Sequence, residues 1–217
     1  MYNITRKNYL AKNLKRLERV FPNDYKFFPQ TWLLPTEYAE LRNHFHKKKP
    51  FTLIVKPEAS SQGKGIFITK KLEDLHPTAH CVVQRYLRSP YLIDGFKFDL
   101  RIYVLITSCD PLKVFLYNEG LGRFATENYE QSTAKDPNYE NLFVHLTNYA
   151  INKSSATYFA SDNPDAEKGH KRSLYSIYCT LEKEGVDVPR VKEEIRDIIL
   201  KTLISIHPEL VHSYRTC

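Results

Sequence analysis

The chain has 217 residues, of which 42% are hydrophobic, and it carries a formal net charge of +7 with a pI near 9.1. No apolar run approaches the roughly 20 residues of a membrane span, and the N-terminus lacks a signal-peptide layout, so we expect a soluble, cytoplasmic protein. The four cysteines are widely spaced and indicate neither a zinc site nor a disulfide framework. The positive charge favours an acidic partner, namely nucleic acid, an anionic membrane, a nucleotide or an acidic protein surface.

The first 50 residues predict two helices joined by an extended connection. Apolar side chains recur at helical spacing over residues 8–21, with lysines and arginines between them, which predicts an amphipathic helix with a basic outer face. Three prolines within residues 22–35 predict the extended connection. Thr36 can then cap a second helix, which ends before Pro50.

Residues 51–69 predict a hairpin with a polar tip. The run Phe51 to Val55 reads as a strand that delivers Lys56 at its end, and a second short strand covers residues 66–69. The loop between them is rich in Gly and Ser, so its exposed backbone N–H groups could lie over phosphates. A plain hairpin turn is an equal alternative, because Gly63-Lys64-Gly65 lacks the Walker A spacing.

A further strand is expected from Cys81 to Leu87, and it contains one polar residue among apolar ones, Gln84. A glutamine near the end of a strand could read the edge of an adenine ring. The commoner situation is an edge-strand glutamine that is hydrogen-bonded to backbone, so both interpretations stay open.

The strongest strand signal is the run Phe96 to Ile106, in which apolar residues alternate with other residues at a period of two. The alternation predicts one apolar face and one face that carries Lys97, Asp99 and Arg101, each about 7 Å from the next. That row could seat an extended anionic ligand. The alternative is an exposed strand face with a local Asp–Arg pair, worth roughly 0–1 kcal/mol.

The remainder predicts an antiparallel partner strand, a polar region and two helices. Residues 113–117 pair with the preceding strand through a turn at 108–111, and two glycines then let the backbone turn beside Arg123. Polar side chains within the apolar run around His145 need partners if they are buried. Residues 174–181 predict a helix that ends at Gly185, and residues 191–206 predict another.

The motifs taken together closely resemble the tubulin tyrosine ligase-like family over nearly the whole chain, and the wording of residues 92–99 and 214–217 resembles its polyglutamylase branch. The motifs are Lys56-Pro57, Gln62-Gly63-Lys64-Gly65-Ile66, Gln84-Arg85-Tyr86, Leu92-Ile93-Asp94-Gly95, Lys97-Phe98-Asp99-Leu100-Arg101, Gly120-Leu121-Gly122-Arg123 and His145-Leu146-Thr147-Asn148.

The resemblance implies an α+β chain with an ATP-grasp fold, built from mixed and antiparallel sheets with flanking helices. It also implies ATP-dependent ligation of L-glutamate to glutamate side chains of tubulin tails through an acyl phosphate, with Mg²⁺. The implied partners are the acidic tails of α- and β-tubulin, microtubules and free glutamate, with no nucleic acid, no membrane and a monomeric state. The implied locations are the cytoskeleton and, within it, the cilium or basal body.

The resemblance also assigns roles to residues. Lys56 and Arg101 are the expected catalytic groups. The expected glutamate-binding residues are Arg123, Tyr149 and Lys171. The expected nucleotide-binding residues are Lys56, Gln62, Gly63, Gln84, Arg85, Tyr86, Leu87, Lys97, Asp99, Arg101, Thr147 and Asn148.

Family members continue past the Tyr-Arg-Thr-Cys motif into strands whose acids hold Mg²⁺, so we expect the metal ligands to lie beyond Cys217. We therefore expect a fragment or short isoform that does not itself ligate glutamate. Its expected parts are a remnant with a linker helix (1–30), a central subdomain with the phosphate-loop hairpin (31–88) and a C-terminal subdomain (89–217). The alternatives are a non-catalytic relative that binds nucleotide or microtubules and an ATP-grasp ligase for another acidic protein. A nucleic-acid binder is the least favoured, because only the charge suggests it.

Overall fold

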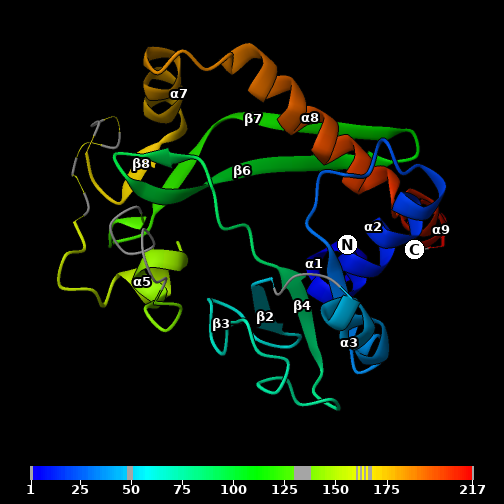
Figure 1. Cartoon of the computed structure of the whole chain (residues 1–217). Coiled ribbons are helices and arrows are strands. Elements are labelled where there is room, and N and C mark those ends of the chain that lie inside the picture. The colour runs from blue at the N-terminus through cyan, green and yellow to red at the C-terminus, as the bar shows by residue number, and fades with distance from the viewer. Residues whose placement is uncertain are drawn as a thin grey trace. The chain divides into compact units, whose positions relative to one another are not determined.

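The computed structural model describes residues 2–47, 51–129, 138–159, 161, 163, 165 and 168–216. The chain divides into two compact units, Met1–Ser89 with Lys201–Ile206, and Pro90–Leu200 with His207–Cys217. Each unit contains a four-stranded antiparallel sheet and helices (Figure 1). The prediction of an α+β fold is confirmed.

The first unit is built on a sheet in the order β1-β4-β2-β3. Its strands are β1 (Thr31–Leu34), β2 (Leu53–Pro57), β3 (Phe67–Thr69) and β4 (Cys81–Arg85), and its helices are α1 (Tyr2–Thr5), α2 (Lys7–Val20) and α3 (Tyr38–Lys47). The two predicted helices are confirmed as α2 and α3. The proline-rich connection contributes β1, which the sequence analysis treated only as extended chain.

Trp32 explains why that connection is ordered. Its side chain is fully buried, and it belongs to a buried apolar cluster with Val83 of the neighbouring strand β4 and with Leu53 and Val55 of β2. Leu41 of α3 joins the same buried cluster. Burial of large aromatic and aliphatic side chains stabilises a short strand whose own sequence has weak periodicity.

The second unit is built on a long hairpin (Figure 1). Its sheet has the order β5-β6-β7-β8. The strands are β5 (Leu92–Ile93), β6 (Phe96–Cys109), β7 (Leu112–Phe124) and β8 (Lys171–Ser173), and the helices are α5 (Leu142–His145), α6 (Tyr149–Asn152), α7 (Leu174–Lys183), α8 (Val188–Ile204) and α9 (His207–Arg215). Lys201–Ile204, the last turn of α8, belongs to the first unit. The predicted strand, its partner and the two C-terminal helices are confirmed.

The prediction of one apolar face along the whole of β6 is wrong beyond its first half. Phe98 and Leu100 pack on the buried cluster that contains Phe124. A shift in the β6–β7 register between Ile102 and Val104 then interrupts the alternation, and Val104 is 38% exposed. An extra residue in one strand changes which side chains face the core, which a strict period of two does not foresee.

The expectation that two glycines turn the backbone before Arg123 is also wrong, because Gly120 and Gly122 lie inside β7. The lack of a side chain at Gly120 and Gly122 lets neighbouring segments lie close to β7. A Cβ atom on Gly120 would lie 2.5 Å from the backbone oxygen of Arg101, and one on Gly122 would lie 2.7 Å from Ile177 of α7. The glycines therefore let β6 and α7 pack directly on β7.

Among the described residues, no helix combines the length and the apolar character needed to cross a lipid bilayer.

Candidate functional site

In the first unit, Lys56 lies at the end of β2 and its ammonium group meets Gln84. Lys56 Nζ donates to Gln84 Oε1 over 2.8 Å, and Gln84 Nε2 donates to Thr31 Oγ1 over 2.9 Å. β4 is an inner strand between β1 and β2. Gln84 is therefore not a glutamine on an edge strand, which was the commoner of the two interpretations of the sequence. Two of the expected nucleotide-binding side chains are thus brought together.

The environment of Lys56 disfavours its positive charge. Burial lowers the pKa of Lys56 below that of a free lysine, and the nearby charge of Lys7 lowers it further. A multiply charged anion beside Lys56 would oppose both effects, because it favours the ammonium form. The position therefore suits a lysine that meets phosphate.

Lys7, which the sequence analysis did not single out, holds the loop that follows Lys56. Its ammonium group donates to the backbone oxygens of Pro57, over 2.9 Å, and of Ser60. The loop then passes through Gln62 and Gly63, whose φ angles are 59° and 87°. A left-handed backbone is uncommon for a non-glycine residue and needs support from its surroundings. Nothing in the sequence separates Lys7 from the other basic residues of α2.

The segment expected to meet adenine is only partly exposed. Tyr86 is 6% exposed and its backbone N–H donates to Thr52 O over 2.8 Å. The Arg85 guanidinium lies over the Phe51 ring at 5.7 Å, and Leu87 is 60% exposed. Arg85 and Leu87 therefore present their side chains at the surface, whereas Tyr86 is part of the interior.

In the second unit, Lys97 and Asp99 of the predicted polar row on β6 have hydrogen-bond partners, and Arg101 differs from them. Lys97 Nζ donates to the backbone oxygen of His145 over 2.9 Å. Asp99 does not pair with Arg101 on its own strand but accepts two hydrogen bonds from Arg123 on β7. Arg101 is exposed and, within the described part of the chain, has neither a hydrogen bond nor an ion pair. The row exists as predicted, and its Asp–Arg contact runs across the strands.

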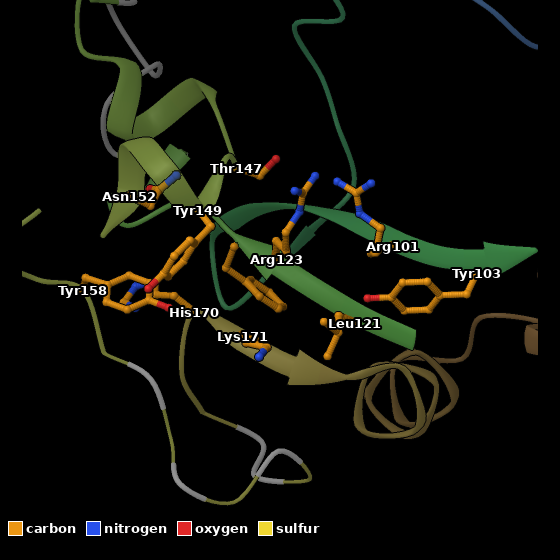
Figure 2. A pocket seen from close by; sticks show the side chains of 11 residues that line it. Arg101, Tyr103, Leu121, Arg123, Thr147, Tyr149, Asn152, Tyr158, His170 and Lys171 are labelled. Atoms are coloured by element: carbon orange, nitrogen blue, oxygen red, sulfur yellow. The ribbon is translucent and has the colours of Figure 1, made fainter. Parts of the chain in front are cut away.

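These strands form one side of a cavity of about 450 Å³, which brings five of the expected site residues together (Figure 2). Figure 2 shows the guanidinium groups of Arg101 and Arg123 rising on the same side of the hairpin. Asn148 is next to Thr147 but does not line the cavity. The expected residues that do are Arg101, Arg123, Thr147, Tyr149 and Lys171.

Buried Asn152 holds the segment that supplies Thr147 and Tyr149. Its side-chain nitrogen donates to the backbone oxygens of Leu146 and Asn148, and its side-chain oxygen accepts from the backbone and hydroxyl of Thr126. The side chain is therefore fully used as a connector, as buried polar groups require. The sequence offered no sign of this role, because Asn152 is the last residue of α6, a four-residue helix that the sequence analysis did not predict.

Tyr158 and His170, which the sequence analysis did not single out, form another wall of the cavity together with the expected Tyr149 (Figure 2). Tyr149 meets Tyr158 edge to face at 6.0 Å, and Tyr158 stacks on His170 at 5.8 Å. Burial lowers the pKa of His170 most, a hydrogen bond to the backbone oxygen of Phe159 raises it, and the nearby charge of Arg172 lowers it. The imidazole is thus biased toward its neutral form, which favours stacking over charge in this wall.

The cavity fits an anion and does not fit Mg²⁺. None of its lining residues is acidic. The carboxylate of Asp99, next to it, is engaged by Arg123 and by the Thr147 hydroxyl. Across the described ranges, no three His, Cys, Asp or Glu residues gather where they could hold a metal ion. Mg²⁺ prefers carboxylate oxygens, so we assign it no step at these residues.

The fold and the cavity define an α+β protein with a cavity that is lined by Arg101, Arg123 and Lys171 and by no acidic residue. The chain belongs to the tubulin-tyrosine ligase family, whose model matches residues 1–217. It is 51% identical over 220 residues to a probable beta-tubulin polyglutamylase of Tetrahymena thermophila, covering 100% of this chain and 18% of the relative. It is 46% identical over 217 residues to tubulin polyglutamylase TTLL6 of Homo sapiens and 38% identical over 221 residues to TTLL7 of Xenopus tropicalis. Each of these covers 100% of this chain, which spans 24% of either relative's length.

Proposed function

We propose that this chain serves ATP-dependent ligation of L-glutamate to glutamate side chains of tubulin tails. The observation that carries the proposal is the second unit's cavity, in which Arg101, Arg123 and Lys171 line one space. The names of the relatives support glutamate as the donor and tubulin as the acceptor. The acidic tubulin tails and the cytoskeleton, including the cilium, are the partner and location that this function implies.

The proposed chemistry places negative charge where the chain offers positive charge. ATP activates an acceptor carboxylate as an acyl phosphate, and the amine of the incoming glutamate displaces phosphate from it. Fixed cationic groups stabilise the charge that gathers on the transferring oxygens. Mg²⁺ would add to this stabilisation when bound. We propose Arg101 for the transferring phosphate, and Arg123, Tyr149 and Lys171 for the carboxylates of free glutamate.

In the first unit, we propose that Lys56 contacts nucleotide phosphates and that the loop through Gln62 and Gly63 covers them. The lowered pKa of Lys56 and the support of that loop by Lys7 are consistent with this assignment. Residues 84–87 would meet the adenine. In the second unit, Lys97, Thr147 and Asn148 complete the proposed nucleotide set, whereas the carboxylate of Asp99, expected there from the resemblance, is engaged by Arg123 and Thr147.

The test separates the donor from the nucleotide. Binding of ATP and of L-glutamate to the 217-residue chain is measured by calorimetry, with L-tyrosine and glycine as competing donors. We expect glutamate to bind in preference to both. Arg123→Ala should weaken glutamate far more than ATP, because a guanidinium–carboxylate fork is lost. Arg190→Ala, which removes an equal charge from the exposed surface of α8, is the matched control.

Transfer of labelled glutamate to microtubules tests the reaction itself. It is followed with the 217-residue chain and with a polypeptide extended to the relatives' length, each with and without Arg101→Ala. Loss of transfer in the Arg101 variant with normal folding by circular dichroism supports the assignment. Preference for tyrosine or glycine, or ATP binding without any transfer by either polypeptide, would replace the proposal with another ligase or a non-catalytic binder.

A further inference from the structure

Asp99 and Arg123 face each other across the β6–β7 hairpin. They are direct partners in the register of the two strands. Arg123 Nε donates to Asp99 Oδ1 over 2.9 Å, and Arg123 Nη2 donates to Asp99 Oδ2 over 2.6 Å. The two parallel hydrogen bonds form a bidentate fork, which fixes the plane of the guanidinium as well as its position.

The fork uses only one edge of the guanidinium. A guanidinium has five N–H donors, and the Nε/Nη2 edge is the one that Asp99 occupies. Nη1 and the second N–H of Nη2 form the other edge. That edge makes no hydrogen bond with a described residue. It can accept a second carboxylate with the same bidentate geometry.

The cavity lies on the side of Arg123, not of Asp99. Arg123 and Thr147 line it, whereas Asp99 is not among the lining residues. In Figure 2 the terminal nitrogens of Arg123 point away from the strand, next to the side chain of Arg101. Asp99 therefore stands behind the guanidinium and orients it without itself facing the space.

The carboxylate of Asp99 has little capacity left for another ligand. Oδ1 accepts from Arg123, and Oδ2 accepts from Arg123 and from the Thr147 hydroxyl. A carboxylate offers about four acceptor positions, of which three are filled. A nucleotide or a metal ion that contacted Asp99 would have to share or break its hydrogen bonds to Arg123. The nucleotide-binding role that the family resemblance implies for Asp99 does not take these hydrogen bonds into account.

We infer that Asp99 is a positioning residue, which locks Arg123 so that the free edge of its guanidinium receives a carboxylate of the donor amino acid. The inference rests on the proposed function and deepens it, because it names how the donor site is built. It also gives Thr147 a task, which is to hold the carboxylate that holds the arginine.

The experiment uses Asp99→Asn in the 217-residue chain, with calorimetric binding of L-glutamate and of ATP as separate readouts. An amide keeps the shape of the carboxylate but turns one oxygen into a donor, so the fork to Arg123 cannot form. We expect glutamate affinity to fall by about tenfold or more, while ATP affinity stays within about twofold. The control is Asp110→Asn, which breaks a carboxylate–arginine pair with Arg215 at the hairpin tip.

A double-mutant cycle shows whether Asp99 acts through Arg123. In an Arg123→Ala background, Asp99→Asn should cause no further loss of glutamate affinity, because the group that it positions is gone. A merely structural aspartate would still cost affinity in that background. The Arg123 Nε–Hε resonance should also move toward the position of a solvated arginine in Asp99→Asn and stay unchanged in Asp110→Asn.

The possible results separate the positioning role of Asp99 from the proposed binding of glutamate, on which that role rests. Normal glutamate binding by Asp99→Asn, or an equal loss for ATP and glutamate, overturns the positioning role alone. An effect of Asp99→Asn that persists in the Arg123→Ala background overturns it too. No glutamate binding by the wild-type chain, with the Nε–Hε resonance still that of a paired arginine, overturns the proposed donor and the inference with it.

Discussion

Lys56 is a half-buried lysine whose positive charge the fold disfavours, so its protonation state should change when an anion binds beside it. Its pKa is lowered by burial and by Lys7. The folded chain therefore binds this proton less well than the unfolded chain does. Between the lowered pKa and the usual value of about 10.4, stability rises with pH, because the unfolded state holds more protons there.

A bound polyphosphate should reverse the shift at Lys56. The anion raises the pKa of Lys56, so binding at alkaline pH is accompanied by proton uptake, and nucleotide affinity falls as the pH rises through the pKa of the complex. Calorimetry of ATP binding in two buffers of different ionisation enthalpy measures the uptake. Lys56→Met should abolish it and weaken ATP severely, whereas Lys12→Met, on the exposed face of α2, should do neither.

Uptake that persists in Lys56→Met would assign the proton to another group. Unchanged ATP affinity in that variant would remove Lys56 from the proposed phosphate site.

At the scale of elements, the hairpin depends on two glycines that let other parts of the fold approach β7. Gly120→Ala places a methyl group 2.5 Å from the backbone oxygen of Arg101. Backbone cannot rotate away as a side chain can, so β6 must shift, at a cost of about 1–3 kcal/mol. Urea denaturation measures the loss, and Asn118→Ala, an exposed position on the same strand, is the control.

The same substitution should disturb the site, because the displaced residue is Arg101 itself. We expect Gly120→Ala to weaken ATP binding even at temperatures where the chain stays folded. A variant that loses stability with unchanged ligand affinity would show that β6 absorbs the methyl group away from Arg101.

How far the elements could be predicted depended on their length and regularity. Fourteen-residue β6 shows its alternation plainly, and seventeen-residue α8 shows its helical period. α5 and α6 have four residues each, and β8 has three, which is too short for any period to appear. Tyr158 and His170, which line the cavity, could not be predicted either. They lie at the two ends of a polar segment outside the helices and strands, where no period can appear.

The sequence predicted several residues of the cavity but not the contacts among them. Alternation placed Lys97, Asp99 and Arg101 on one face correctly. It could not show that Asp99 would pair with Arg123 across the hairpin, because the β6–β7 register depends on two shifts that no local pattern encodes. The support that Asn152 gives to Thr147 was hidden likewise, since it arises from hydrogen bonds to backbone.

At the scale of the whole molecule, the net charge of +7 makes an electrostatic prediction about the acceptor. Tubulin tails are acidic, so their attraction to this chain should be mainly Coulombic and screened by salt. We expect the affinity for an acidic tail peptide to fall markedly between about 50 and 200 mM salt, as the Debye length shortens toward roughly 7–8 Å. Fluorescence anisotropy of a labelled glutamate-rich peptide measures this.

The composition of the surface allows a sharper form of that experiment. Arg190 and Arg196 are exposed but already paired with Glu194 and Glu193 on α8, so neutralising them should change the salt dependence little. Arg101 and Lys171 have no such partner among the described residues and line the cavity. Arg101→Gln with Lys171→Gln should therefore reduce both the affinity and its salt slope, while Arg190→Gln with Arg196→Gln, which removes the same net charge, should leave the slope near wild type. Equal slopes in both double variants would mean that the tail responds to the total charge of the molecule and does not reach this cavity.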